Sequence, residues 1–227
     1  MTTPLRLVIF DVDGTLVDSQ GDIVAAMTHA FAAVSAPVPP RVAILGIVGL
    51  SLDVAMARLA PDLDTADHAR MVAAYKDAYM TLRAEQGAAQ SSPLYPGALD
   101  VLQALHAVPD VLLGVATGKS KRGLDKLLEG HDLGHLFVTQ QVADFHPSKP
   151  HPSMILQAMA DTGVNADQTV MIGDTSFDMD MAAAAGVAGV GVAWGYHPVA
   201  DLHRATRIIE EFAALPPALD QIWSIPA

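Results

Sequence analysis

Hydrophobic residues recur along the chain in short, nearly unbroken runs, and amphipathic stretches with helical spacing separate the runs. The runs predict strands at residues 5–10, 111–116, 137–140, 169–172, 187–192 and 207–209. The stretches between them predict helices near residues 97–107, 119–129, 152–162, 177–185 and 199–203. Apolar runs of this kind are typical of parallel strands buried on both faces, and their alternation with helices is typical of doubly wound sheets. The pattern predicts an α/β fold: a doubly wound parallel sheet, or Rossmann-like core.

One long segment breaks this alternation. Residues 17–92 contain no convincing strand, and their apolar positions follow helical spacing, most clearly over residues 71–82. A loop at residues 87–96, rich in Ala, Gln, Ser and Pro, returns the chain to the alternating pattern. We therefore predict a core made of residues 1–16 and 93–227 and a helical cap domain, residues 17–92, inserted after the first strand. This segment is called the helical insert below.

Composition and charge narrow the range of partners. Hydrophobic residues make up 51% of the chain and charged residues 17%, which indicates a globular fold rather than disorder. The 13 Lys and Arg against 25 Asp and Glu give a net charge of -12, which repels nucleic acid and anionic lipid. The uncharged stretch at residues 181–196 is interrupted by glycines and is shorter than the ~20 residues that a membrane span needs. We expect neither nucleic acid nor a membrane as a partner.

Two further features bear on location. The chain contains no cysteine, which excludes a disulfide framework, a thiolate zinc site and a cysteine nucleophile. Residues 1–6 lack the basic-then-apolar pattern of a secretory signal. Both features favour a cytoplasmic protein, and the sequence leaves open whether it is a monomer or a homodimer.

The first apolar run ends in an acidic turn. The run delivers Asp11 and Asp13, two residues apart, into the sequence Asp-Val-Asp-Gly-Thr. Residues i and i+2 of a strand point the same way, and two like charges so close are costly unless a cation or a proton resolves their repulsion. The turn therefore predicts a metal site that also performs acid–base chemistry, with phosphoryl transfer as the expected reaction.

Polar residues also follow later strands, and the carboxyl ends of parallel strands share one crevice. Thr117-Gly118-Lys119 combines a hydroxyl, a glycine that lets a backbone N–H approach, and the start of a helix. That combination suits a phosphate site, although it also suits an ordinary helix N-cap. Lys149 stands among three prolines just before a helix, a restriction that is unusual for a merely solvated charge. We expect both segments to converge on Asp11.

A second acidic turn follows the strand predicted at residues 169–172. Asp174 stands at the strand end and Asp178 in the first turn of the next helix. Helix capping explains one of these aspartates but not the recurrence of an acidic turn at a neighbouring strand end. Together with Asp11 and Asp13 they form a set of oxygen ligands, and hard oxygen ligands select Mg²⁺ over zinc. The sequence therefore predicts a magnesium site.

Two other metal sites do not fit the sequence. A calcium loop starting at Asp11 would need an acid and a glycine where Thr15 and Leu16 stand. His131 and His135 are four residues apart, but the glutamate of a zinc protease helix is missing between them. Neither calcium nor zinc is therefore expected.

These residues resemble the four motifs of the haloacid dehalogenase superfamily of phosphohydrolases. In chain order the matching residues are Asp11-Val12-Asp13-Gly14-Thr15, Thr117, Lys149, and Gly173-Asp174 with Asp178. The resemblance covers the whole chain, because the helical insert stands where the family's alpha-helical cap lies. Residues 10–19, 95–97, 149–152 and 194–196 carry a finer resemblance to the phosphoglycolate phosphatase branch.

The resemblance implies a role for each residue. Asp11 would be the nucleophile that forms an aspartyl-phosphate, and Asp13 would protonate the leaving group and then activate water. The implied Mg²⁺ ligands are Asp11, Asp13 through its backbone carbonyl, Asp174 and, in support, Asp178. Thr117 and Lys149 complete the implied catalytic set, and the implied substrate-binding residues are Gly14, Thr15, Gly118 and Lys119.

The leading interpretation is therefore a Mg²⁺-dependent phosphatase of small organic phosphomonoesters. A phosphomutase or a pyrophosphatase of the same family would share all four motifs. A dehalogenase is disfavoured, since it needs neither a metal nor an acid at Asp13, and a non-catalytic phosphate-binding regulatory module is the alternative from another class.

The expected partner is a small phosphorylated metabolite. Four of the five lysines fall between Lys119 and Lys149, which locally favours an anionic substrate. The helical insert carries five cations that could meet a substrate carboxylate: Arg41, Arg58, Arg70, Lys76 and Arg83. With the resemblance, these cations favour 2-phosphoglycolate or a similarly compact phosphate.

Overall fold

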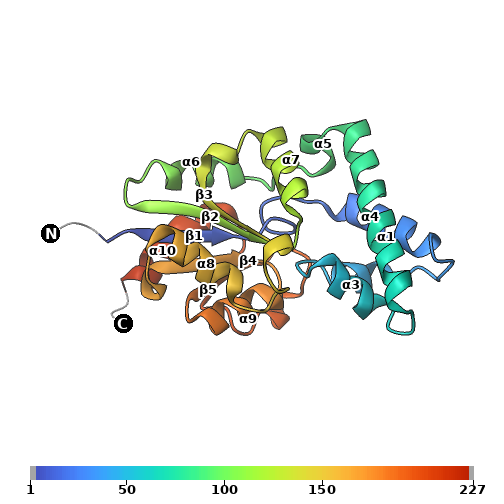
Figure 1. The fold of residues 1–227 in the computed structure, drawn as a ribbon. Coiled ribbons are helices and arrows are strands. Elements are labelled where there is room, and N and C mark those ends of the chain that lie inside the picture. Colours follow the sequence, from blue (N-terminus) through green and yellow to red (C-terminus); the bar gives the residue numbers. More distant parts are fainter. Residues whose placement is uncertain (1–3, 225–227) are drawn as a thin grey trace.

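The computed structural model describes residues 4–224, so residues 1–3 and 225–227, the two ends of the predicted core, lie outside the described residues. A six-stranded sheet in the order β3-β2-β1-β4-β5-β6 forms the centre of the fold, and all its neighbouring strands pair in parallel. Its strands are β1 Arg6–Phe10, β2 Val111–Thr117, β3 Phe137–Val142, β4 Thr169–Gly173, β5 Ala188–Val192 and β6 Arg207–Ile209. The predicted doubly wound α/β fold is confirmed (Figure 1).

Successive side chains of β1 point to opposite faces of the sheet, and both faces are covered by apolar side chains. Val8 and Phe10 pack with helices α6, α7 and α10, while Leu7 and Ile9 pack with α8 and α9. All four side chains are fully buried, so every position from Leu7 to Phe10 faces an apolar layer.

The helices outside the helical insert follow the predicted positions with two exceptions, one predicted helix that does not form and one helix, α10, that was not predicted. The observed helices are α6 Ala98–His106, α7 Lys121–His131, α8 Ser153–Thr162, α9 Ser176–Ala185 and α10 Leu215–Trp223. The helix predicted at residues 199–203 is wrong: only the short 3₁₀ turn Val199–Asp201 forms there, where the N–H groups of Asp201 and Leu202 bond three residues back. Helix α10 was not predicted because its first turn contains two prolines. Proline is nevertheless well tolerated in the first turn of a helix.

The helical insert contains α1 Gln20–Ala32, α2 Arg41–Leu45, α3 Leu52–Leu59, α4 Thr65–Gln86 and α5 Ala88–Ser91. The last of these lies within the predicted 87–96 loop, which is therefore partly helical. The apolar residues of α1 to α4 form a hydrophobic cluster of their own, and Phe177 of α9 joins it.

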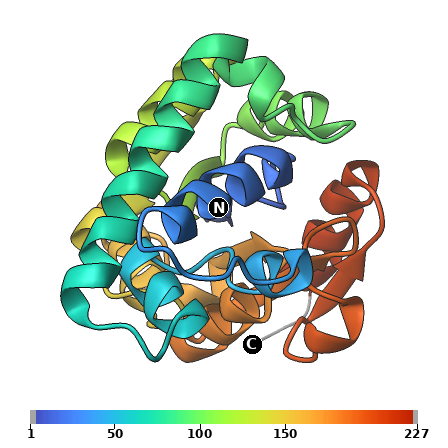
Figure 2. The same ribbon diagram turned by 90° about the vertical axis from the view of Figure 1, so that its right-hand side faces the viewer.

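The helical insert lies beyond the carboxyl ends of the strands, and α1 and α4 run beside each other across it (Figures 1 and 2). Its boundaries at residues 17 and 92 stay a prediction. Within residues 4–224, no helix is both long enough and apolar enough to cross a bilayer.

Candidate active site

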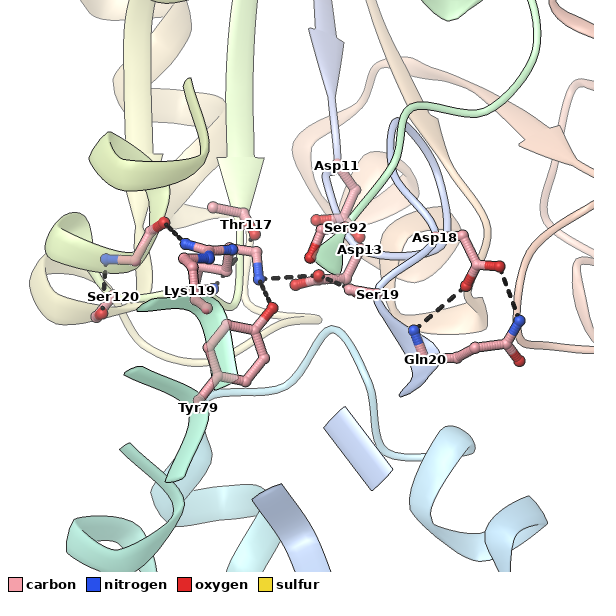
Figure 3. A network of polar contacts seen from close by, with 12 residues as sticks. Asp11, Asp13, Asp18, Ser19, Gln20, Tyr79, Ser92, Thr117, Lys119 and Ser120 are labelled. Atoms are coloured by element: carbon pink, nitrogen blue, oxygen red, sulfur yellow. Dashed lines mark hydrogen bonds and ion pairs between the residues drawn. The ribbon is translucent and has the colours of Figure 1, made fainter. Parts of the chain in front are cut away.

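The predicted polar segments meet at the carboxyl edge of the sheet. Asp11 follows β1, Thr117 ends β2 and Asp174 follows β4, and these three strands are neighbours in the sheet. Figure 3 shows Asp11, Asp13, Thr117 and Lys119 around one space at this edge. Asp11, Thr117 and Asp174 are each at most 1% exposed. The convergence predicted for the carboxyl ends of the strands is therefore present.

Lys149 reaches this edge from the loop before α8 and lies between two carboxylates. Its Nζ is 2.8 Å from Asp11 Oδ1 and 2.6 Å from Asp178 Oδ1, and its side chain is fully buried. Burial opposes the charge of the ammonium, but the two carboxylates outweigh it and raise the pKa of Lys149 above its ordinary value. Lys149 is therefore a permanent cation that faces the space beside Asp11.

Three of the predicted metal ligands form a compact cluster. Asp11, Asp174 and Asp178 each offer one carboxylate oxygen, and these oxygens lie within 4.8 Å of one another. Burial, opposed by the Lys149 charge, raises the pKa of Asp11 from 3.8 to about 7. Burial, together with the charges of Asp178 and Asp11, raises the pKa of Asp174 well above its ordinary value. Three carboxylates and one ammonium thus leave the cluster short of positive charge.

The cluster fits a divalent cation. Asp11 makes its ion pair with Lys149, but neither of its buried oxygens accepts a hydrogen bond of ordinary geometry. Buried anionic oxygens without hydrogen bonds are costly unless a charge compensates them. An all-carboxylate set of this kind suits Mg²⁺.

The carboxylate of Asp13 lies outside this cluster and has partners of its own. It accepts a hydrogen bond from the Ser19 hydroxyl, and its Oδ1 is 2.9 Å from Lys119 Nζ. The Ser19 N–H in turn donates to the Tyr196 hydroxyl at 2.9 Å. The Asp13 side chain is thus held apart from the other acids, and its assignment as a metal ligand through the backbone carbonyl stays a prediction.

Gly14 and Thr15 contact Asp174. The Thr15 hydroxyl donates to Asp174 Oδ1 at 2.9 Å, and the Tyr196 N–H donates to Oδ2 at 2.8 Å. Gly14 has a φ of +83°, and a Cβ at this position would lie 2.3 Å from Asp174 Oδ2. Both residues therefore position a carboxylate of the acidic cluster, and the substrate-binding role expected for them stays a prediction.

Asp178 serves helix α9 as well as the cluster. Its Oδ2 accepts hydrogen bonds from the N–H and the hydroxyl of Thr175, which completes a capping box. Its other oxygen pairs with Lys149. Helix capping therefore holds this carboxylate in place beside Asp11 and does not compete with its place in the cluster.

Gly118 lies at a close approach between the core and the helical insert. A Cβ on Gly118 would lie 2.6 Å from the carbonyl oxygen of Gly49 and 2.7 Å from that of Leu50. The helix N-cap of α7 is Ser120, so Thr117 and Gly118 are not needed for capping. The missing side chain of Gly118 allows the backbone of the helical insert to lie against the catalytic edge.

We expect Gly118→Ala to lower kcat/KM about 10-fold or more, because the new methyl group meets backbone atoms that cannot rotate away. Gly134→Ala is the matched control, since a Cβ there meets nothing within 4 Å. Steady-state kinetics and thermal melting of both variants test this expectation. Equal kinetics for the two variants would show that the close approach at Gly118 is unimportant for activity.

Sequence reasoning assigned no individual role to Ser19, Tyr196 or Tyr79. The Ser19 N–H donates to the Tyr196 hydroxyl across 177 residues of sequence, and the Lys119 ammonium donates to the Tyr79 hydroxyl across 40 residues (3.2 Å). Local sequence patterns do not predict such long-range pairings. Ser19 and Tyr196 were included only in the segments 10–19 and 194–196 that carry the finer resemblance.

A cleft of about 1010 Å³ opens between the helical insert and the core, and Asp11 and Asp13 lie on its wall. Of the five cations of the insert, Lys76 and Arg83 line this cleft. The other three are engaged elsewhere: Arg41 with Gln20, Arg58 with the Phe177 ring, and Arg70 with Asp67. The candidates in the insert for binding a substrate carboxylate are thus narrowed to Lys76 and Arg83.

Comparison with known proteins agrees with this geometry. The model of the family described as haloacid dehalogenase-like hydrolase matches residues 8–192. The chain is 40% identical to a probable phosphatase, IndB, from Dickeya dadantii, over 88% of this chain and 86% of that protein. It is 31% identical to a phosphoglycolate phosphatase from Salmonella typhi, over 95% and 92%. A hydrolase from Pseudomonas syringae has a similar crystal structure (TM-score 0.84, 27% identity), which covers 96% of this chain and 100% of that one.

Proposed function

The chain belongs to the haloacid dehalogenase-like hydrolases, and from this we propose that it is a Mg²⁺-dependent phosphatase of an organic phosphomonoester that acts through an aspartyl-phosphate. The observation that carries the proposal is the separation of two kinds of carboxylate. Asp11 lies in the buried acidic cluster beside Lys149, while Asp13 lies outside it with Ser19 and Lys119. This separation supports nucleophilic attack by the first carboxylate and proton transfer by the second.

In the first step a carboxylate oxygen of Asp11 bonds to phosphorus, and the bond from phosphorus to the ester oxygen breaks. Asp13 gives its proton to that leaving oxygen. In the second step water attacks phosphorus, Asp13 takes a proton from it, and the bond between Asp11 and phosphorus breaks to release phosphate.

Several residues stabilise charge or fix geometry in these steps. Lys149 faces the phosphoryl oxygens as a cation, and the hydroxyl of Thr117 and the N–H of Gly118 lie at the same edge. Ser19 and Lys119 orient the Asp13 carboxylate. Asp11, Asp174 and Asp178 would hold Mg²⁺, which, when bound, offsets the repulsion between carboxylate and phosphate.

We also propose that the helical insert acts as a cap over the site. Beside the contact at Gly118, the Ser51 N–H donates to Ser148 Oγ at 2.9 Å, one residue before Lys149. His197 Nε2 lies 3.2 Å from the Gly46 carbonyl oxygen. A cap in this place would exclude water while Asp11 attacks.

The phosphatase is favoured over a non-catalytic regulatory module because none of the expected catalytic groups is missing. A phosphomutase or a pyrophosphatase would use the same residues, so substrate trials must decide. A small phosphorylated metabolite as partner, a cytoplasmic location and a monomeric or homodimeric state stay predictions, as does 2-phosphoglycolate as substrate.

The test is a phosphate-release assay over a panel of phosphomonoesters, sugar phosphates and pyrophosphate, with Mg²⁺ and with a chelator. We expect phosphate release from monoesters that stops on chelation and returns with Mg²⁺. Isomerisation of a sugar phosphate without net release would establish the mutase, and rescue by zinc alone would contradict the oxygen-ligand argument. No turnover of any member of the panel would favour the regulatory module.

Metal binding should also change the thermal stability of the protein in a pH-dependent way. The pKa of Asp11 rises on folding from 3.8 to about 7, so the folded chain holds a proton that the unfolded chain has lost between these pH values. Stability of the metal-free protein should therefore fall as pH rises from about 4 to about 7, by up to about 4 kcal/mol. We expect added Mg²⁺ to raise Tm more at about pH 8 than at about pH 5.

Asp11→Asn is the control for this measurement, since the amide cannot titrate. The variant should lose the part of the pH dependence of the Mg²⁺ effect that comes from Asp11, while Asp174, whose pKa burial also raises, keeps its own part. A Mg²⁺ effect on Tm that is equal at both pH values in the unsubstituted protein would contradict the assignment of the cation to this cluster.

A further inference from the structure

The cleft beside Asp11 is larger than a compact substrate needs. Its volume is about 1010 Å³. Pockets of about 300–1,000 Å³ bind drug-sized ligands. A leaving group as small as glycolate would leave most of this space unfilled.

Apolar side chains line much of this space. The lining side chains from α1 and from the segment before α3 include Ile23, Met27, Ile47, Val48 and Leu50. Each of these is at most 9% exposed, so the wall is packed and preformed. A glycolate moiety has almost no apolar surface to bury against it, whereas a ring or a branched carbon skeleton would gain free energy in proportion to the area that it covers.

Arg83 is a buried cation on the wall of the same cleft. It is 9% exposed, and its Nη1 donates to the carbonyl oxygen of Gly123 at 3.0 Å. Its Nε and Nη2 have no hydrogen-bond partner, and no carboxylate among residues 4–224 pairs with it. A buried guanidinium without a counter-ion is costly, so an anionic group on a ligand would complete it.

Arg83 and Lys119 lie around one aromatic ring of the cleft wall. The Lys119 Nζ lies 2.9 Å from Asp13 Oδ1 and 5.0 Å from the centre of the Tyr79 ring. The Arg83 Cζ lies 5.1 Å from the same ring centre. All three residues line the same cleft as Asp11 and Asp13, so Arg83 lies on the wall that surrounds the leaving group.

We propose that the substrate is a phosphomonoester whose leaving group has an apolar, ring-sized body and, opposite the phosphate, a carboxylate or similar anionic acceptor that Arg83 binds. This inference rests on the proposed phosphatase function and concerns the substrate class of that same site. Arg83 becomes a specificity-determining residue for one end of the substrate, while Asp11 and Lys149 act at the other.

The first experiment compares three esters on the unsubstituted protein with Mg²⁺: 4-carboxyphenyl phosphate, phenyl phosphate and 2-phosphoglycolate. We expect kcat/KM to fall in that order, with about a 10- to 100-fold gain from the carboxylate on the ring. If 2-phosphoglycolate is the best of the three, the inference is wrong although the phosphatase stands. If none of the three nor any panel ester releases phosphate, the proposed function itself fails.

The second experiment removes the guanidinium. Arg83→Met should lower kcat/KM for 4-carboxyphenyl phosphate about 10- to 100-fold, to the level of phenyl phosphate, and leave phenyl phosphate nearly unchanged. Arg70→Met is the matched control, because Arg70 lies on the same helix, carries the same charge and pairs with Asp67 at an exposed position. We expect the control to change neither ester.

A different pattern would overturn the inference. An equal fall for all three esters in Arg83→Met would show that Arg83 only fastens the helical insert to α7 through the Gly123 carbonyl. If the variant is poorly folded, inhibition of the unsubstituted protein decides: 4-hydroxybenzoate should inhibit phenyl phosphate hydrolysis at lower concentration than phenol does, and equal inhibition by the two would contradict the inference.

Discussion

Asp11→Asn should leave a folded protein with no measurable turnover. The amide has the shape of the carboxylate but cannot attack phosphorus, and loss of a nucleophile in a comparable covalent mechanism costs on the order of 10⁶ in kcat. Stability should not fall, because the substitution removes one of three crowded acids while Lys149 keeps its ion pair with Asp178. Phosphate release and thermal melting, both measured with Mg²⁺ and with a chelator, check the two halves of this prediction.

Asp180→Asn is the matched control for Asp11→Asn. Asp180 lies on α9 two residues beyond Asp178, but its partner is Arg204 at 2.9 Å and both side chains are partly exposed. Its amide variant should keep full activity. Substantial turnover by Asp11→Asn would mean that water attacks the ester directly, and the aspartyl-phosphate would have to be abandoned.

The sequence predicted the catalytic edge well because its determinants are local. Buried strands need unbroken apolar runs, and a parallel sheet brings the residues that follow those runs to one edge. Asp11, Asp174 and Asp178 could therefore be placed together before any distance was known, and the structure brings their oxygens within 4.8 Å.

The parts that sequence reasoning missed depend on contacts between distant residues. Arg83 was one of five candidate cations, and nothing in the local sequence separates it from Arg70, which is exposed on the same helix, whereas Arg83 is buried and reaches the Gly123 carbonyl oxygen of α7. The hydrogen bond from the Ser19 N–H to the Tyr196 hydroxyl was missed for the same reason, since the two residues are 177 positions apart in the chain.

The structure gives a second reason for the glycine at position 118. Gly118 was expected to let its backbone approach a phosphate, and the structure shows that its missing side chain also makes room for the Gly49 and Leu50 carbonyl groups of the helical insert. A local pattern cannot distinguish a glycine that a ligand needs from one that a neighbouring segment needs, because both require only the absence of a Cβ.

Lys149→Met should reduce kcat by about 10²–10³ or more, because the ammonium faces the group in which charge redistributes during transfer. It should also destabilise the metal-free protein by about 3–5 kcal/mol, since Asp11 and Asp178 lose a buried partner. Methionine is unbranched and only one atom shorter than lysine, so the chief change is the loss of the charge. Thermal melting and phosphate release at saturating Mg²⁺ measure the two effects.

The two effects can be separated because Mg²⁺ and Lys149 compensate the same carboxylates. Saturating Mg²⁺ should restore much of the stability of Lys149→Met, while turnover stays low because, among residues 4–224, Asp11 pairs with no cationic side chain besides Lys149. Lys121→Met is the control on α7, where Lys121 pairs with Asp125 at an exposed position and should be silent in both assays. Full recovery of turnover together with stability would assign Lys149 to the fold alone, and the phosphoryl group would then need another cation.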